Sequence, residues 1–255
     1  MKFEYKYLVK AELLPELRAL FCPFMELDIN MKKGGPSGYT VRSIYFDTLN
    51  YNDYYEKING LKKRKKTRLR GYNYLTPASI VFLETKVKNN KLSSKYRAPV
   101  LYDHLKELLK SGNFDQYILT DMGIKNVLDN SRRFLFDIYR HALQPKILII
   151  YEREAFVGKI DHTLRITFDK NIRSSAHPSI DRLFREENIK CTMSGHFVME
   201  VKFVRNFPVW LSTILRTRGL KKQAFSKYTK CIDDHKLLNS SLQQKKLDFI
   251  QAVRF

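Results

Sequence analysis

The chain has 255 residues, of which 44% are apolar and 29% are charged, a composition that excludes a disordered polyelectrolyte and permits a sizeable core. Its 47 lysines and arginines outnumber 26 aspartates and glutamates, so the formal net charge is +21. Such an excess favours an anionic partner, and nucleic acid, an anionic membrane surface and a polyphosphorylated small molecule all satisfy it. The length fits a single domain over residues 1–255.

Cysteine spacing and hydropathy exclude further classes of protein. Cys22, Cys191 and Cys231 form no Cys-x-x-Cys pair and have no ligand at metal spacing, which argues against a disulfide framework and a structural zinc site. No stretch reaches 18 apolar residues, and charged side chains interrupt the first 20 residues. We therefore expect a cytoplasmic protein without an integral membrane segment, for which association with a membrane surface stays open.

The predicted elements follow the periodicity of the apolar residues. Alternating and β-branched runs predict eight strands, at 3–10, 39–47, 67–72, 80–88, 94–100, 147–156, 163–169 and 197–204. Helical spacing predicts helices at 11–21, 51–58, 101–110, 120–142 and 208–218. The remaining segments are expected to be a glycine-rich turn at 34–38, a solvated basic loop at 62–66, a loop with a short helix at 170–196 that could act as a lid, a basic closing segment at 221–238, and a polar tail.

Charged residues recur at every second position inside the predicted strands. The sets are Glu4/Lys6, Arg68/Arg70, Glu84/Lys86/Lys88, Arg165/Asp169 and Glu200/Lys202. The residues between them are mostly apolar or aromatic, so each strand presents one charged face and one face that requires a hydrophobic cover. A flat solvated sheet satisfies this pattern, and so does a barrel with a polar interior and helices outside. The barrel implies a tunnel that binds phosphates.

The chemistry of such a site must come from side chains. The sequence lacks G-x-x-x-x-G-K-[ST] and G-x-G-x-x-G, so neither a P-loop nor a dinucleotide fold is indicated. Arginine forks and lysine ammonium groups on alternate strand positions, ~6.6–6.8 Å apart, suit successive phosphoryl groups. Taken alone, Arg68/Arg70 can be a basic pair on a solvated strand, and Glu84/Lys86 and Glu200/Lys202 can each be an exposed ion pair worth about 0–1 kcal/mol, but the repetition argues against independent surface contacts.

Glu200 is the candidate metal ligand. A carboxylate beside phosphates is repelled unless a divalent cation bridges them. Glu4 and Glu84 are at least as well explained as groups that organise neighbouring lysines and arginines. The six histidines show no triad or metal spacing, so nucleophilic catalysis is not indicated.

Read in order, the segments resemble the triphosphate tunnel metalloenzyme superfamily and, within it, the catalytic domain of the vacuolar transporter chaperone (VTC) polyphosphate polymerases. The resemblance covers nearly the whole chain and rests on the ordered set of short motifs. They are Phe-Glu-Tyr-Lys-Tyr at 3–7, Val-Arg-Ser-Ile-Tyr-Phe-Asp-Thr at 41–48, Arg-Leu-Arg-Gly-Tyr at 68–72, Glu-Thr-Lys at 84–86, Tyr-Glu-Arg at 151–153, Leu-Arg-Ile-Thr-Phe-Asp at 164–169, Glu-Val-Lys-Phe at 200–203 and Ser-Lys-Tyr at 226–228. One departure is Lys2, where members often carry arginine.

The resemblance implies an α+β fold, an eight-stranded antiparallel β-barrel whose tunnel is surrounded by helices. It implies catalytic basic residues at Lys6, Arg68, Arg70, Lys86, Arg153, Arg165 and Lys202. It further implies substrate phosphate binding by Lys95, Lys227 and Lys230, and a Mn²⁺ or Mg²⁺ cofactor on Glu200. The eukaryotic polymerases also carry phosphate-sensing and membrane domains, so this chain is expected to be a stand-alone form.

Three functions follow as hypotheses. The first is a metal-dependent polymerase that transfers the γ-phosphate of ATP to inorganic polyphosphate, its two expected partners. The second is hydrolysis of inorganic triphosphate or nucleoside triphosphates in the same tunnel. The third is a non-enzymatic polyphosphate-binding module. Sequence-specific nucleic acid is not expected as a partner, because the aromatic residues mostly occupy the apolar strand faces rather than interleaving with exposed basic ones.

Overall fold

A strongly curved antiparallel sheet forms the centre of the protein. The computed structural model describes residues 3–29, 31, 38–90, 92–204 and 206–238. In chain order the strands are β1 (Phe3–Lys10), β2 (Met25–Leu27), β3 (Tyr39–Asp47), β4 (Lys63–Tyr72), β5 (Ile80–Asn89), β6 (Leu92–Leu101), β7 (Gln144–Gly158), β8 (Arg165–Ala176), β9 (Lys190–Cys191) and β10 (His196–Phe203). Alternation of apolar and polar residues, together with β-branched and aromatic side chains, accounts for the long strands.

The prediction of a closed eight-stranded barrel is wrong. The sheet has ten strands in the described part of the chain, and its main path runs β1-β10-β8-β7-β3-β4-β5-β6, with β2 added to β7 and β9 to β8. β1 and β6 are its two ends, and no backbone pairing joins them among the described residues. Charged side chains cross the gap instead, since Glu4 on β1 lies 3.7 Å from Lys86 on β5. Strands pair at roughly 4.8 Å, a spacing that leaves no room for such side chains between two backbones.

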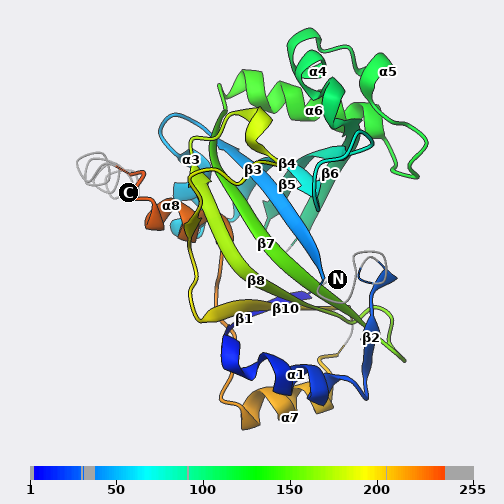
Figure 1. The fold of residues 1–255 in the computed structure, drawn as a ribbon, viewed down its shortest axis with the longest axis vertical. Helices are drawn as coiled ribbons and strands as arrows, with labels where there is room; N and C mark the ends of the chain where they lie inside the picture. Colours follow the sequence, from blue (N-terminus) through cyan, green and yellow to red (C-terminus); the bar gives the residue numbers. More distant parts are fainter. Residues whose placement is uncertain (1–2, 30, 32–37, 91, 205, 239–255) are drawn as a thin grey trace.

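Helices cover the convex face of this sheet at both ends (Figure 1). In chain order, the helices of the described residues on both faces are η1 (Ala11–Leu13), α1 (Leu14–Phe21), α3 (Asn52–Ile58), η2 (Tyr102–His104), α4 (Leu105–Ser111), α5 (Phe114–Tyr117), α6 (Val127–Arg140), η3 (Ile180–Arg182), α7 (Val209–Thr217) and α8 (Lys227–Asp234). α1 and α7 pack on β1, β8 and β10 around Leu17, Phe168 and Leu211. α4 and α6 pack on β3 to β6 around Leu69, Leu83 and Phe134.

The concave face is divided into an apolar part and a charged part. α8 and α3 cover the apolar part, where Tyr45, Ile149 and Tyr228 form a third buried cluster. Tyr228 donates a hydrogen bond to Asp47 Oδ2 at 2.5 Å and stacks on Tyr45 at 5.3 Å between ring centroids. The sequence pattern predicted a uniformly polar concave face, and this cluster corrects it. The remaining part of the face carries the charged residues.

Other differences from the predicted elements are local. The helix predicted at 120–142 is confined to α6, and α5 was missed. The predicted loop at 170–196 instead continues β8, contains η3 and adds β9. The predicted basic loop at 62–66 is wrong from Lys63 on, because β4 begins there. Residues 34–37 of the turn predicted at 34–38, and the tail predicted beyond residue 238, lie outside the described residues.

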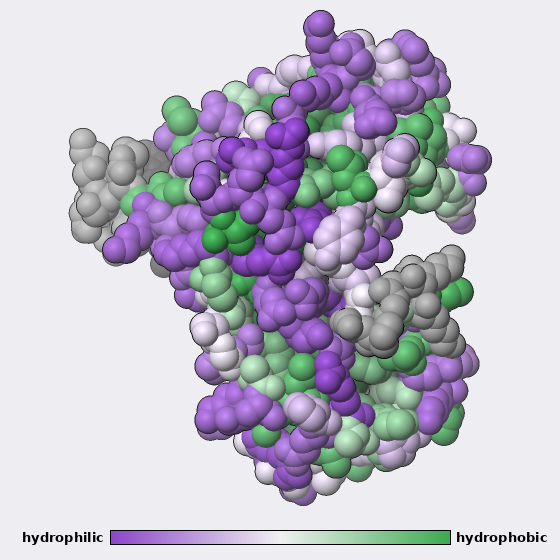
Figure 2. Space-filling view, viewed as in Figure 1, coloured by the Kyte–Doolittle hydropathy of each residue, from purple (hydrophilic) through white to green (hydrophobic). Residues whose placement is uncertain are grey.

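The face shown in Figure 2 is mostly hydrophilic, with apolar side chains in smaller groups. Scattered apolar side chains are normal on a soluble surface. Among the helices that the structure describes, none has the length and apolar character needed to cross a membrane.

Candidate functional site

One half of the charged concave face is built around Glu84. This carboxylate on β5 is only 1% exposed, yet four cations from β4 and β6 surround it. Arg68 Nη2 lies 2.7 Å from Oε2, and Lys95 Nζ and Arg97 Nε lie 2.6 and 3.1 Å from Oε1. Arg70 Nε is farther, at 3.9 Å from Oε2. Cross-strand register explains the group, because Glu84 lies directly opposite Arg68 on β4 and Arg97 on β6.

Hydroxyl groups fix the orientation of the two β4 arginines. Arg68 Nη1 donates to Tyr45 Oη at 2.7 Å, and Arg70 Nε donates to Ser43 Oγ at 3.1 Å. Tyr45 and Ser43 face Arg68 and Arg70 from β3 in cross-strand register. The two guanidinium groups are therefore held before any anion arrives, which lowers the conformational cost of binding one.

The other half of the charged face is built around Asp169 and Glu200. Arg153 on β7 donates two parallel hydrogen bonds to Asp169, at 2.6 and 2.7 Å, and its Nη2 lies 3.7 Å from Glu200 Oε2. Lys227 of α8 reaches both carboxylates, in an ion pair with Asp169 and at 3.1 Å from Glu200 Oε1. Lys6 and Lys202 approach Glu200 to 3.4 and 3.6 Å.

α8 is anchored so that Lys227 points inward. Ser226 caps the helix by accepting a hydrogen bond from the Thr229 amide at 3.3 Å, and its hydroxyl also accepts one from Lys66 Nζ at 2.8 Å. Tyr54 donates to Asp233 Oδ1 at 2.5 Å near the other end of the helix. These contacts account for the Ser-Lys-Tyr motif as a capping residue, an inward cation and a buried aromatic anchor.

Cations outnumber carboxylates where the two halves meet. Glu4 at the gap between the sheet ends lies 3.4 Å from Lys6 and 3.7 Å from Lys86. Among the described residues, the inward-facing groups joined by these ion pairs and hydrogen bonds are ten cations and four carboxylates. The cations are Lys6, Lys66, Arg68, Arg70, Lys86, Lys95, Arg97, Arg153, Lys202 and Lys227, and the carboxylates are Glu4, Glu84, Asp169 and Glu200.

The pKa shifts of these groups reflect that excess. Burial opposes ionisation of Glu84 and Glu200, but the surrounding cations outweigh it and hold the pKa of each carboxyl below its ordinary value. Burial, reinforced by Lys6, Lys57 and Arg68, lowers the pKa of Lys66 to about 7. Burial also lowers the pKa of Lys95 to about 8, with neighbouring Arg97 and Arg68 contributing and Glu84 opposing the shift. An entering anion would relieve this repulsion.

The structure brings most of the predicted site residues onto this one face. Lys6, Arg68, Arg70, Lys86, Lys95, Arg153, Lys202, Lys227 and Glu200 belong to the set described above. Arg165 shares the face by its register with Lys202, but it is 44% exposed and lies 3.0 Å from Asp28 Oδ2 at the margin. Lys230 is separate, since it is exposed and pairs with Asp234 one helical turn away. Lys227 and Lys230, three residues apart on α8, therefore differ in environment, because only Lys227 is buried against the charged face.

Two members of the set, Lys66 and Arg97, were missed from the sequence. Lys66 and Arg97 continue the alternation of Arg68 and Lys95 by two residues, so the strand period alone could have found both. Asp169 was recognised as part of the charge pattern but not as a partner of Arg153 and Lys227.

The carboxylates fit a divalent cation only together with substrate oxygens. Within the described residues, no group of three or more His, Cys, Asp or Glu side chains is arranged to hold a metal. The Oγ1 atom of Thr167, opposite Glu200 on β8, is buried and has no hydrogen-bond partner among the described residues. Mg²⁺ commonly binds through one or two carboxylates together with waters and substrate phosphates, a ligand set that Glu200 can join.

Comparisons with known proteins agree with the ordered motifs. The family model of the VTC domain matches residues 1–234. Subunit 4 of the vacuolar transporter chaperone complex from Trypanosoma brucei brucei is 24% identical over 266 residues, which cover 88% of this chain and 33% of that protein. Subunit 2 of the complex from Schizosaccharomyces pombe is 25% identical over 144 residues, 54% of this chain and 20% of that protein. The match thus spans a third or less of either relative.

A solved structure, the Mimivirus capping enzyme triphosphatase, aligns with 83% of this chain and 97% of its own, at 12% identity and a TM-score of 0.19. A score this low carries no argument about fold or activity. The family match does identify the family, because it extends over residues 1–234. The chain belongs to the VTC domain family.

Proposed function

We propose that this protein is a metal-dependent polyphosphate polymerase that transfers the γ-phosphate of ATP to the end of an inorganic polyphosphate chain. Membership of the VTC domain family and the relatives' place in a vacuolar transporter chaperone complex support a polyphosphate-related role. The observation that carries the proposal is the convergence of ten cations and four carboxylates on one concave face. A linear polyanion satisfies several such cations at once.

The cations of the concave face fall into two groups, arginines that short contacts hold in place and lysines whose contacts are longer. Arg68 and Arg70 are held by hydroxyls and by Glu84, and Arg153 is held by Asp169. These guanidinium groups are oriented to bind phosphate oxygens in fork geometry. We assign them the role of aligning the triphosphate and of stabilising charge on the transferring phosphoryl group, which is the main protein contribution to this class of reaction.

The lysines provide mobile charge beside that rigid group. Lys6, Lys86 and Lys202 pair with carboxylates at 3.4 to 3.7 Å, which is longer than a direct hydrogen bond, so an anion can displace these contacts. We assign them to the acceptor chain and the leaving diphosphate. Mn²⁺ or Mg²⁺ on Glu200, when bound, would neutralise charge on phosphate oxygens.

Product analysis tests the proposal. Purified protein with ATP, Mn²⁺ or Mg²⁺ and a short polyphosphate primer is expected to yield ADP and chains longer than the primer. The matched comparison is Arg153→Lys, which keeps the charge but loses the two-point contact with Asp169, and is expected to lower kcat by at least tenfold. Absence of both ADP and long chains from the wild-type protein would contradict the proposal.

The alternatives have their own products. Orthophosphate released from ATP or tripolyphosphate without long chains would identify a hydrolase. Tight binding of polyphosphate without turnover, unchanged or increased in Glu200→Ala, would identify a binding module. In that variant the loss of a carboxylate removes repulsion from the polyanion, whereas a metal-dependent enzyme loses its activity.

A further inference from the structure

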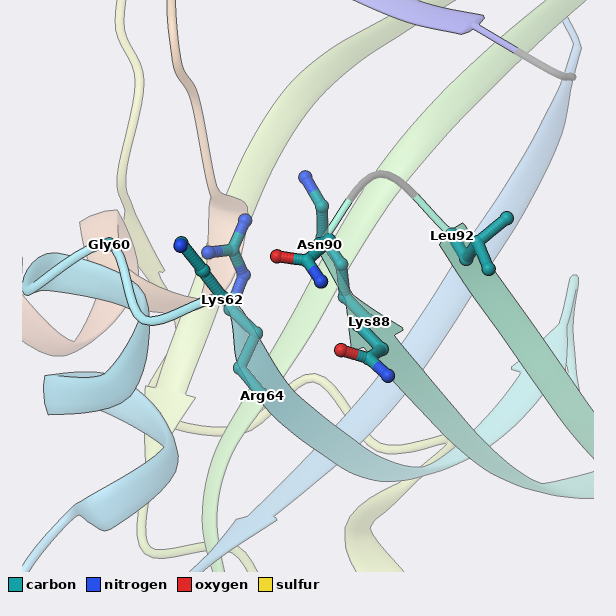
Figure 3. A pocket seen from close by; sticks show the side chains of 7 residues that line it. Gly60, Lys62, Arg64, Lys88, Asn90 and Leu92 are labelled. Atoms are coloured by element: carbon teal, nitrogen blue, oxygen red, sulfur yellow. The ribbon is translucent and has the colours of Figure 1, made fainter.

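A second basic hollow lies at the open end of the β4–β5 hairpin, where β4 begins and β5 turns into β6. It has a volume of about 650 Å³ and is lined by Gly60, Lys62, Arg64, Lys88, Asn89, Asn90 and Leu92. Figure 3 shows the side chains of Lys62, Arg64 and Lys88 extending to the same side of the hairpin. None of these three cations forms an ion pair within the part of the chain that the structure describes. The hollow therefore carries positive charge that the protein itself does not neutralise.

The β4–β5 ladder connects this hollow to the site on the concave face. Arg68 faces Glu84, the next inward pair is Lys66 with Lys86, and the next is Arg64 with Lys88. Successive inward pairs are ~6.6–6.8 Å apart along the strands. Like charges directly opposite each other destabilise a sheet, and here two such pairs follow one another. The pairs Lys66/Lys86 and Arg64/Lys88 are both positively charged, and they follow one another along β4 and β5 from the arginine cluster to the hollow.

Electrostatic coupling supports the continuity of this track. Burial lowers the pKa of Lys88, and the nearby Arg64, Lys86 and Lys6 lower it further. The pKa of Lys57, at the end of α3, is likewise lowered by burial and by Arg64, Lys6 and Lys88. Cations of the hollow and of the concave site are thus close enough to affect each other's protonation.

We propose that the hollow formed by Lys62, Arg64 and Lys88 is a second polyanion site, which binds the distal part of an inorganic polyphosphate chain whose end lies at the arginine cluster. The inference rests on the proposed function and extends it by giving the chain a direction along β4 and β5. Polyphosphate suits the site better than single-stranded nucleic acid, because the lining residues include three cations and two amides but no aromatic ring on which a base could stack.

A charge-matched pair of variants tests the second site. The first carries Lys62→Gln, Arg64→Gln and Lys88→Gln. The control carries Lys63→Gln, Lys110→Gln and Lys125→Gln, which removes three exposed cations elsewhere, including the neighbour of Lys62 and Arg64 on the opposite side of β4. Binding of tripolyphosphate, of polyphosphate of about 60 units and of an RNA oligonucleotide of equal charge is measured for both and for the wild type.

The hollow variant is expected to bind long polyphosphate about tenfold more weakly, as three lost contacts of exposed-pair strength predict, while its affinity for tripolyphosphate stays within twofold. The control is expected to bind both as the wild type does. Equal losses in the two variants, no loss in the hollow variant, or an equal loss for RNA would overturn the inference. A wild-type protein that bound long chains through the hollow but not tripolyphosphate would contradict the proposed function and leave the second site supported.

Discussion

Replacement of Glu84 by glutamine tests how the arginine cluster is held. The carboxylate is 1% exposed and has Arg68, Lys95 and Arg97 within 3.1 Å and Arg70 at 3.9 Å. Glutamine keeps the size and one acceptor oxygen but removes the charge. Because a buried charge left without its partner costs about 3–5 kcal/mol, we expect Glu84→Gln to lower the free energy of unfolding by about 4 kcal/mol.

Anion binding should recover part of that loss. Tripolyphosphate at 100 times its dissociation constant stabilises a protein by about 2.7 kcal/mol. The variant presents cations that no carboxylate neutralises, so we expect it to bind the anion about tenfold more tightly than the wild type. At the same concentration of tripolyphosphate, this tighter binding stabilises Glu84→Gln by about 1.4 kcal/mol more than the wild type. The difference in free energy of unfolding between the two proteins therefore falls by the same amount.

Acid pH should also reduce the difference in free energy of unfolding between the wild type and Glu84→Gln. The cations around Glu84 outweigh its burial and lower its pKa, so the folded protein keeps the carboxylate ionised where the unfolded chain, near the ordinary value of 4.5, takes up a proton. The stability that Glu84 contributes is therefore fully present above pH 4.5 and declines as the pH falls below it. Glutamine does not titrate, and its contribution stays constant.

Thermal and urea unfolding with and without tripolyphosphate measure these effects. A loss of about 4 kcal/mol corresponds to a fall of roughly 10 °C in Tm for a domain of this size. The control is Glu187→Gln, which breaks the half-exposed pair with Arg182 and is expected to change stability by less than 1 kcal/mol. A tripolyphosphate effect that is smaller in Glu84→Gln than in the wild type would refute the reasoning, since it would mean that the arginines bind anions only when Glu84 orients them.

The remaining predictions concern two lysine pairs. Lys227→Met should weaken tripolyphosphate binding at least tenfold, measured by calorimetry, because the substitution removes the cation between Asp169 and Glu200. The affinity of Lys230→Met should stay within twofold of the wild type, and equal losses in the two variants would contradict the separate positions of the two lysines. Lys66, whose pKa is lowered to about 7, should gain a proton when an anion binds, so that binding at pH 7 takes up roughly half a proton more in the wild type than in Lys66→Arg. Titration in buffers of different ionisation enthalpy measures this uptake, and identical values for the two proteins would disprove it.

Strand periodicity was sufficient to predict which residues share a face. All eight long strands were predicted, although β8 runs beyond its predicted end, because each is rich in β-branched or aromatic residues and most alternate apolar and polar residues over part of their length. The same period placed Arg68, Glu84 and Glu200 on the concave side. A period of two contains no information about the partner across a strand, so the contacts of Glu84 with Lys95 and Arg97 required the register.

Closure of the sheet could not be predicted in the same way. Whether the two ends of a sheet pair depends on the accumulated twist and curvature of all strands, which no single segment determines. The position of α8 on the concave face could not be predicted from the sequence either. Tyr228 and Ile232 have helical spacing, but the sequence alone does not indicate that they fill the concave side rather than the convex side.

The open edge and the surplus of charge are connected. Glu84, Asp169 and Glu200 neutralise only part of the positive charge in the two halves of the face, and Lys6, Lys66 and Lys86 add further charge where β1 approaches β5. A backbone seam at this place would bring these lysines together without an anion between them. An open seam leaves room for a polyanion to lie between them. The charge excess that disfavours closure of the barrel is thus the same feature that provides the affinity for phosphate.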